Sequence, residues 1–378
     1  MKMQIALAAA LATSLVSTTA LADGVVANRS AGGPVDFARA KPMPMPRALT
    51  EPPSLSEALA TRVPDLGPQG FSPGHVGDGR MRPEAVPPLT RSDAPIVGPA
   101  QFGTSNQPFT TARADASGNA TSRYYPYRVS GKLFFKVGAS TYMCSASLIK
   151  RGLVVTAAHC VARFGVGWNS SWQFIPAYSN GSAPYGVWTT RRQVIMGSYL
   201  NGTDSCYQRG VICQNDVAVL ELTAKSGTYP GTSTGWYGAC WGGYGFTGPG
   251  LSNGALTHIT ELGYPGGLDN GALMERTDSY GIVSSTMSFN TLIGSQQGGG
   301  ASGGPWLINF GVAPAVTGTD GVQGAEASSN CVVGTASWAY TGGSSGVRRM
   351  GASPFLSSNI GALISNACAN AASSAVCN

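Results

Sequence analysis

From about Tyr124 onward the chain is a series of short apolar runs separated by glycine, serine and asparagine. The runs are rich in Val, Ile, Thr, Tyr, Phe and Trp; examples are GKLFFKVG, GLVVTAAH, NDVAVLEL, DSYGIVSSTM and CVVGTASWAY. Repeated runs of this kind, with turn residues between them, are typical of the strands of a sandwich or barrel. Roughly 250 residues are too many for one small barrel, so the pattern predicts an all-β fold with two packed barrels. One helix is expected late in the chain, in SPFLSSNIGALISNACANAA, where apolar residues recur at helical spacing.

Two segments precede this region. Residues 1–22 carry Lys2 ahead of an apolar run and end in Ala-Leu-Ala, which predicts a secretory signal peptide cleaved after Ala22. A membrane anchor is the alternative, although Thr and Ser residues interrupt the run and it is short for a membrane span. Residues 23–123 hold 15 of the 24 prolines and no cysteine. Such a stretch buries too little apolar surface to offset its ordering entropy, so we expect a pro-segment or a disordered arm there, followed by a folded domain in residues 124–378.

Composition excludes several classes of function. Charged residues make up 11% of the chain and the net charge of +6 forms no basic block, so nucleic-acid binding is not expected. The three histidines form no HxxxH pair and the cysteines form no CxxC pair, so a dedicated metal site is not expected. No stretch after the signal peptide approaches about 18 continuous apolar residues, so the mature chain is expected to stay off the membrane.

The cysteines are even in number in a chain that carries an export signal. They are Cys144, Cys160, Cys206, Cys213, Cys240, Cys331, Cys368 and Cys377. Four disulfides are the economical interpretation in an oxidising compartment, and a free nucleophilic thiol is the competing one. Eight cysteines allow about a hundred pairings, so the residues alone leave the connectivity open.

A histidine and an aspartate stand beside two of the apolar runs. In CSASLIKRGLVVTAAHC the run Leu153 to Val155 leads through small residues to His159, where an imidazole is positioned to move protons near neutral pH. A structural histidine is the alternative. In CQNDVAVLEL, Asp216 precedes a strand, and a carboxylate buried there needs a partner such as an imidazole N–H. An Asx turn that begins the strand is the alternative.

A third candidate is Ser302 in GGGASGGPW. A serine nucleophile that attacks a carbonyl needs two N–H donors aimed at the developing oxyanion, and the amides of Gly300 and Ser302 are the candidates. Glycine allows the amide of Gly300 to turn inward, and Gly303 and Gly304 allow a sharp exit into PWLINF. A flexible glycine loop is the alternative, but it does not explain why an apolar strand begins directly after Pro305.

Together, TAAHC, NDVAVLEL and GGGASGGPW, in the order His, Asp, Ser, resemble the chymotrypsin/trypsin-like serine peptidases. Within that family the similarity is greatest to bacterial secreted members. TASWAY resembles the substrate-binding strand of that family, SGVRRM the base of its pocket, and ELGYPGG the bacterial secreted members. The resemblance spans roughly residues 124–366. It implies two packed six-stranded Greek-key antiparallel β-barrels with a C-terminal helix.

The resemblance also implies roles for individual residues. His159 would be the general base, Asp216 would orient it, and Ser302 would be the nucleophile, with the Gly300 and Ser302 amides as oxyanion donors. No metal or organic cofactor is implied. The implied disulfides are Cys144–Cys160 at the histidine loop, Cys206–Cys213, Cys368–Cys377 and, for the remaining two cysteines, Cys240–Cys331.

The substrate pocket implied by the resemblance contains Gln296, Ser337, Trp338, Ala339 and Gly346. Gln296 stands where trypsin-like members have an aspartate, which argues against a preference for Lys or Arg.

Two further departures involve Ala301 and Ala336. Ala301 replaces the aspartate that receives the new N-terminal ammonium in vertebrate digestive enzymes, and Ala336 replaces the histidine of glutamyl endopeptidases. Ala339 also stands where a glycine is usual and narrows the pocket. We therefore expect a preference for substrates with a neutral side chain at the cleavage site. Activation through a new N-terminal ammonium is not expected.

These observations predict a secreted serine endopeptidase, extracellular or periplasmic, acting on protein or peptide substrates. An inactive homologue that binds proteins is the rival, but such relatives usually lose a triad residue. An α/β-hydrolase esterase needs its histidine after the serine, and no histidine follows Ser302. The oligomeric state is left open.

Overall fold

The computed structural model describes ten stretches of the chain. They are residues 24–30, 33–48, 67–90, 107–115, 119–242, 246–248, 251–283, 291–313, 329–340 and 348–378. The predicted signal peptide, residues 1–22, and the pocket residue Gly346 lie outside the described residues. Within those stretches, no helix has the length and apolar character needed to cross a bilayer.

Six antiparallel strands close the first barrel. They are β6 (Ser130–Val137), β7 (Ser140–Lys150), β8 (Leu153–Thr156), β11 (Ser170–Pro176), β13 (Trp188–Met196) and β14 (Ala218–Leu222). Around the barrel the order is β6-β7-β8-β14-β13-β11, and β11 pairs back onto β6. Every residue of β8 and β14 is buried, which explains why these two runs read as continuous rather than alternating apolar sequence.

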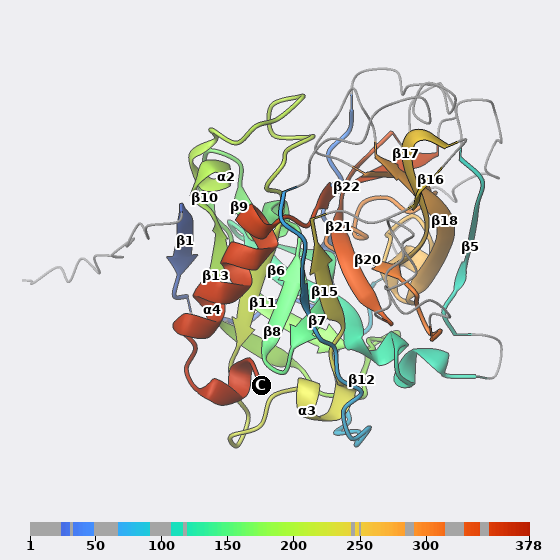
Figure 1. The fold of residues 1–378 in the computed structure, drawn as a ribbon. Coiled ribbons are helices and arrows are strands. Elements are labelled where there is room, and N and C mark those ends of the chain that lie inside the picture. Colours follow the sequence, from blue (N-terminus) through green and yellow to red (C-terminus); the bar gives the residue numbers. More distant parts are fainter. Residues whose placement is uncertain are drawn as a thin grey trace, which may run out of the picture.

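Six more antiparallel strands close the second barrel. They are β17 (Leu251–Gly263), β18 (Glu275–Val283), β19 (Thr291–Gly294), β20 (Pro305–Ile308), β21 (Cys331–Ala339) and β22 (Arg349–Pro354). The order around this barrel is β17-β18-β19-β22-β21-β20, closed by the pairing of β20 with β17. In both barrels the first three strands follow each other and the last three return in reverse, which is a Greek-key order. The predicted fold class is confirmed, and the two barrels stand side by side in Figure 1.

Short elements connect the barrels and complete their surfaces. They are β9 (Ala162–Arg163), β10 (Gly167–Trp168), β12 (Ser182–Ala183), α2 (Gly197–Asn201), α3 (Gly231–Thr234), β15 (Gly238–Trp241) and β16 (Phe246–Gly248). There are also single-turn segments: η1 (Thr121–Arg123), η2 (Tyr127–Val129), η3 (Ala158–Cys160), η4 (Asp269–Gly271) and η6 (Ser374–Val376).

The C-terminal helix is shorter than the segment in which it was expected. Strand β22 runs on to Pro354, and a π-helical turn, η5 (Ser357–Gly361), precedes α4 (Ala362–Ala369). Helix α4 follows the second barrel in sequence but packs on β13 and β14 of the first (Figure 1). The chain end therefore ties the two barrels together.

The described parts of residues 23–123 contain five short strands that pair with later strands of the chain. They are β1 (Val25–Asn28), β2 (Lys41–Pro42), β3 (Gly70–Ser72), β4 (Glu84–Ala85) and β5 (Phe109–Arg113). Their partners are β13, β7, β15, β12 and β18, respectively.

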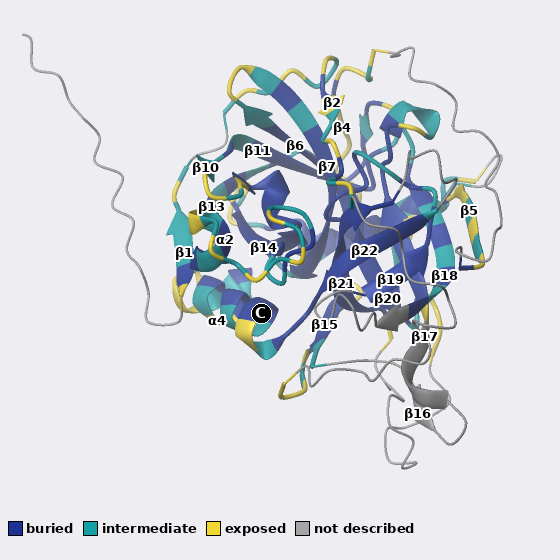
Figure 2. Ribbon diagram, turned by 90° about the horizontal axis from the view of Figure 1, so that it is seen from above, coloured by how far each residue is buried: buried dark blue, intermediate teal, exposed yellow. Residues whose placement is uncertain are grey.

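The pairing of these strands concerns residues 23–123, for which a pro-segment or a disordered arm was expected. Its described portions include five short strands whose backbone groups bond to other strands and so need no core of their own. Figure 2 shows the contrast between the largely buried barrels and the partly exposed β1 and β5. Whether the segment is a pro-segment stays a prediction.

Four disulfides join Cys144–Cys160, Cys206–Cys213, Cys240–Cys331 and Cys368–Cys377, which are the pairs that the resemblance implies. The partners are separated by 16, 7, 91 and 9 residues along the chain. The pair Cys240–Cys331 links β15 to the start of β21 and closes by far the longest loop.

Loop length predicts an unequal loss of stability when single bridges are removed. Replacing Cys240 and Cys331 together by serine should lower the free energy of unfolding by about 4.5 kcal/mol. The same change at Cys206 and Cys213 should lower it by about 2.4 kcal/mol, because the unfolded chain gains less freedom from a short loop. Denaturant titration without reductant measures both values, and equal losses for the two variants would contradict this account.

Candidate active site

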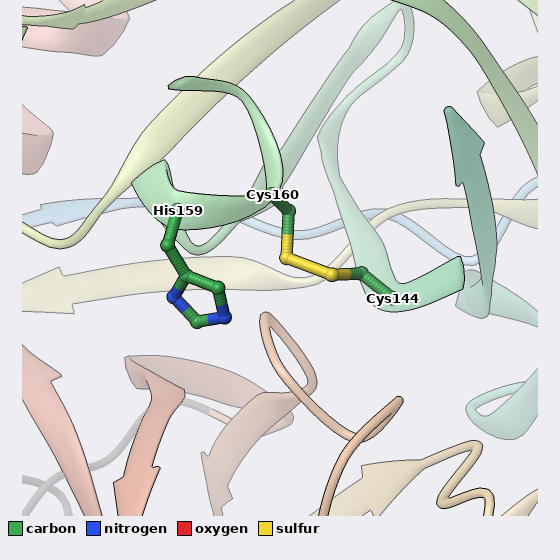
Figure 3. Close-up of side chains that lie close together, drawn as sticks. All are labelled: Cys144, His159 and Cys160. Atoms are coloured by element: carbon green, nitrogen blue, oxygen red, sulfur yellow. A yellow bond between two sulfur atoms is a disulfide. The ribbon is translucent and has the colours of Figure 1, made fainter. Parts of the chain in front are cut away.

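His159 sits in the short turn that follows β8. The strand ends at Thr156, the turn η3 carries the histidine, and the neighbouring Cys160 is bonded to Cys144 of β7. Figure 3 shows the imidazole and the disulfide on one side of this turn. The ring is buried, with a relative exposure of 6% for the residue. The disulfide thus anchors the turn that presents the histidine.

Asp216, directly before β14, receives three hydrogen bonds. The backbone N–H of His159 donates to Oδ1 at 2.8 Å, and His159 Nδ1 lies 2.8 Å from Oδ2. The hydroxyl of Ser337, from β21 of the second barrel, donates to Oδ2 at 2.5 Å. The carboxylate is buried, so we assign the imidazole proton to Nδ1, facing it, which leaves Nε2 as the acceptor nitrogen.

Ser302 lies in the turn that leads into β20. Its carbonyl oxygen accepts the N–H of Ser145 at 2.8 Å and lies 3.9 Å from Cys160 Sγ. The serine turn of the second barrel therefore meets the histidine turn of the first at the disulfide. Ser302 Oγ and His159 Nε2 are both buried, and among the described residues neither has a hydrogen-bond partner.

Two glycines of this turn have conformations that a side chain would not tolerate. Gly303 has φ +78°, and a Cβ there would lie 2.0 Å from Thr156 Oγ1 and 2.5 Å from the Ser145 carbonyl oxygen. Gly300 has φ +93°, and a Cβ there would lie 2.6 Å from the Tyr264 carbonyl oxygen. These glycines allow the turn to dock closely, as the glycine-rich sequence predicts. The N–H of Gly300 donates to the carbonyl of Met43 at 3.0 Å.

Ser145 on β7 holds this turn, although the sequence analysis did not identify it. Its N–H donates to Ser302, its hydroxyl donates to the Gly300 carbonyl at 2.9 Å, and the same hydroxyl accepts the Tyr264 N–H at 2.9 Å. Its own carbonyl accepts the Thr156 hydroxyl at 2.9 Å. A serine in an apolar strand gives no local signal of this role, because its partners come from the other barrel.

The residues expected to line the substrate pocket do not all lie in one place. Trp338 and Ala339 are buried on β21, and Trp338 packs edge-on against Tyr340 with ring centroids 5.0 Å apart. Ser337 faces Asp216, as described above, and not an open pocket. Gln296 lines a hollow with Arg113 and other residues of β5 and the 268–275 region.

That hollow contains a charged cluster. Arg113 forms a bidentate ion pair with Asp269, with both N–O distances 2.5 Å. Arg113 holds the pKa of Asp269 below its usual range. Burial and the neighbouring Asp269 raise the pKa of Glu275 to about 8.

Groups of potential metal ligands occur at two places in the described residues. One is Cys144, His159 and Cys160, and the other is Asp204, Cys206 and Cys213. In both groups the two cysteines are bonded to each other. A disulfide sulfur is not a thiolate, so neither group offers the donor set of a cysteine metal site.

A buried glutamate on β17 was also not anticipated. Glu261 has no exposed surface, and its Oε2 accepts the Ser295 hydroxyl at 2.9 Å. Burial raises the pKa of this carboxyl to about 8. The carboxyl is therefore largely neutral near pH 7.

A match to a known family decides the affiliation of the chain. The family model described as Trypsin matches residues 117–342, more than half of the chain. The chain belongs to the trypsin family. The resemblance seen in the sequence is thereby confirmed, and membership of the trypsin family supports a serine-type peptidase function.

One curated protein matches part of the chain. The extracellular metalloprotease of Bacillus subtilis (strain 168) is 31% identical over 116 residues, which are 30% of this chain and 33% of that protein. The match thus spans about a third of the length of that relative.

Solved structures were also compared. Protease Anisep from Arthrobacter nicotinovorans has a TM-score of 0.49 and 22% identity, covering 64% of this chain and 96% of that one. The thermostable serine protease AL20 from an extremophilic microorganism has a TM-score of 0.45 and 24% identity, covering 61% and 93%. A Glu endopeptidase has a TM-score of 0.44 and 19% identity, covering 73% and 100%.

Removing the Ser145 hydroxyl should impair the site of this trypsin-family protein without unfolding it. Ser145→Ala leaves the Gly300 carbonyl and the Tyr264 N–H without their partner. For the peptidase function that family membership supports, we expect kcat to fall by about 10–100-fold with little change in KM. Ser147→Ala is the matched control, because Ser147 is a buried serine of the same strand whose hydroxyl has no partner among the described residues. Equal effects of the two variants would contradict a positioning role.

Glu261 should make stability depend on pH. Because its pKa is raised in the folded protein, the folded state binds the proton more tightly than the unfolded state does. This contribution to stability is fully present below about pH 4.5 and is lost as the pH rises toward about 8. Unfolding titrations across this window should show a decline that Glu261→Gln reduces. An identical decline in the variant would show that Glu261 does not titrate there.

Proposed function

We propose that the protein is a secreted serine endopeptidase in which Ser302 is the nucleophile, His159 the general base and Asp216 the residue that orients it. One observation carries this proposal: an imidazole fixed by a buried carboxylate, with its Nε2 and the Ser302 hydroxyl both buried and unpartnered in the described part of the chain. Buried polar groups normally have partners, and a catalytic role is one explanation when two reactive groups in one region lack them. Affiliation with a peptidase family supports the same assignment.

The proposed reaction begins when Ser302 Oγ attacks the carbonyl carbon of a peptide bond. His159 Nε2 takes the hydroxyl proton, and the oxyanion that forms is stabilised by the N–H groups of Gly300 and Ser302. Collapse of the tetrahedral intermediate breaks the carbon–nitrogen bond, and His159 gives its proton to the leaving amine. Water then attacks the acyl-enzyme, again with His159 as base, and releases the acid and Ser302. Each step is completed by these side chains and water.

Asp216 matters because it fixes which imidazole nitrogen carries the proton. Its Oδ2 faces Nδ1, so Nε2 keeps the lone pair needed to accept the Ser302 proton. The imidazolium formed during attack is then next to a buried carboxylate, which stabilises it. The Ser337 hydroxyl and the His159 N–H hold the carboxylate in place.

The remaining features proposed for this enzyme concern its export, maturation and specificity. The sequence of residues 1–22 supports signal-directed export, and four disulfides are typical of an oxidising compartment. Residues 23–123 would be a pro-segment. Ala301 is buried and offers no carboxylate for a new N-terminal ammonium, so maturation would act in another way. Gln296 supports substrates with neutral side chains.

Substitution of Ser302 tests the proposal directly. Ser302→Ala should lower the rate of peptide hydrolysis by on the order of 10⁴-fold or more, because no other group supplies the attacking oxygen. Ser205→Ala, at an exposed serine, is the control and should leave the rate unchanged. Circular dichroism should show both variants folded. Retained hydrolysis in Ser302→Ala would exclude the assigned nucleophile.

A covalent probe separates an active enzyme from an inactive homologue. A fluorophosphonate applied to the exported protein should attach to Ser302, identified by peptide mass. N-terminal sequencing of the labelled species should find a start between about residues 100 and 125 if residues 23–123 are removed. No labelling of a folded protein trimmed at that boundary would favour a binding homologue instead.

A further inference from the structure

One part of the proline-rich segment lies across the candidate site. Residues Lys41–Ala48, KPMPMPRA, are called the strap below. Its first half follows β7: β2 pairs in parallel with that strand, and the Met43 N–H donates to the Met143 carbonyl at 2.9 Å. The Met43 carbonyl then accepts the N–H of Gly300, one of the two assigned oxyanion donors, at 3.0 Å.

The second half of the strap follows β21. The N–H of Ala339 donates to the Pro46 carbonyl at 3.0 Å, and the N–H of Ala48 donates to the Ala339 carbonyl at 3.2 Å. Between these two attachments lies Met45, which is only 7% exposed. Its side chain belongs to the buried apolar cluster that contains Ala301, Ala336 and Ala339. The strap thus occupies both walls of the site and the apolar space between them.

We propose that the strap is an internal ligand of the substrate cleft that keeps the full-length chain latent, with Met45 filling the pocket beside β21. This inference rests on the proposed function, because it takes Gly300 and Ser302 as the site of attack. The Met43 carbonyl occupies a donor that a substrate carbonyl would need. No substrate can take that donor until the strap has left.

The direction of the strap explains how it can occupy the site without being a good substrate. TASWAY, which resembles the substrate-binding strand of the family, forms the end of β21, so we infer that the acyl half of a substrate would pair with β21 and that the leaving half would pass β7. A substrate therefore runs from β21 to β7. The strap runs from β7 to β21, with Lys41 opposite Tyr142 and Arg47 opposite Ala339, both in parallel.

Because the strap runs opposite to a substrate, the carbonyl and nitrogen sides of the peptide bond that faces Gly300 are exchanged. That bond joins Met43 to Pro44, so in the reversed strap its nitrogen would lie toward β21 and not on the β7 side, where the mechanism protonates the leaving amine. The nitrogen also belongs to a proline ring and differs from an ordinary secondary amide.

The alternating prolines of the strap suit this role. Pro42, Pro44 and Pro46 restrict the backbone to extended conformations, so less entropy is lost on binding than for a flexible segment. Proline has no N–H, so these positions leave no donor unsatisfied. The N–H groups that do bond to the walls come from Met43 and Ala48, which are not prolines.

The pocket side chain gives the substrate class. Met45 is unbranched and apolar, and the buried apolar cluster to which it belongs holds four small alanines, Ala301, Ala336, Ala339 and Ala352. Once the strap has left the cleft, we therefore expect the enzyme to prefer substrates whose residue before the cleaved bond has an unbranched or lightly branched apolar side chain. Burial of a charged side chain in such a pocket would cost free energy without a partner.

The test uses the full-length chain, with Met45→Asp as the variant that expels the strap. A carboxylate at this position cannot remain in the apolar pocket without a partner. The rate at which a fluorophosphonate labels Ser302 should rise about tenfold or more, because labelling scales with the fraction of open clefts. Met81→Asp is the matched control: it places the same charge at an exposed methionine of the same segment and should label like the wild type.

A second variant and a second measurement keep the outcome interpretable. Ala48→Pro removes the N–H that bonds to Ala339 without touching either barrel, and it should also speed labelling. Hydrogen–deuterium exchange reports the strap independently of activity. The amides of Met43 and Ala48 should be protected in the wild type. Both should exchange faster in Met45→Asp, and the Met43 amide should exchange faster in Ala48→Pro, which has no amide proton at position 48.

The possible outcomes separate this proposal from the proposed function. Unprotected Met43 and Ala48 amides in the wild type would overturn the proposal, as would loss of protection without faster labelling. If no protein labels at Ser302, even after limited proteolysis has removed residues 23–123, the proposed function fails. The exchange data alone would then decide whether the strap occupies the cleft.

Discussion

The candidate site depends on the docking of two barrels at one seam. His159 and Asp216 come from the first barrel, and Ser302 comes from the second. Two hydrogen bonds across the seam set their relative positions: Ser145 of the first barrel holds the Ser302 carbonyl, and Ser337 of the second holds the Asp216 carboxylate. Each barrel thus supplies one serine that orients a residue of the other. A small shift between the barrels would disturb both contacts together.

The same dependence explains which parts of the site could be predicted from sequence. His159, Asp216 and Ser302 each stand at the end or start of a buried run, so a strand pattern and a reactive residue type coincide locally. The Gly300 and Gly303 conformations could also be anticipated, since glycine-rich turns indicate positive φ or close approach. The fold followed from the same short runs, and the order of strands in each barrel from the resemblance.

What could not be predicted depends on contacts between distant parts of the chain. Ser145 is an ordinary serine in its strand, and its role exists only once Gly300 and Tyr264 lie next to it. In the sequence, Glu261 is likewise one charged residue in a strand. Its pKa is raised because the second barrel encloses its carboxyl. The proline-rich segment has too little apolar sequence for a core, but this does not prevent it from adding strands to a sheet that exists already. Composition predicts whether a segment can fold alone, but not whether it can pair with the edge of an existing sheet.

The strap is a weak ligand by itself, and its strength depends on being tethered. It offers a few backbone hydrogen bonds, each with a net value of about 1 kcal/mol, and one buried methionine side chain with about 1.5–3 kcal/mol. As a free peptide it would also lose translational freedom on binding, which offsets most of this gain. Attached to the same chain, it faces the cleft at an effective concentration on the order of millimolar. A cut between the strap and the barrels would leave β1 on the same fragment as the strap, because β1 precedes it in the chain. While β1 stays paired with β13, the strap is still held near the cleft. Latency would therefore be lost only when β1 has left as well, whereas β5, which follows the strap, can stay on β18.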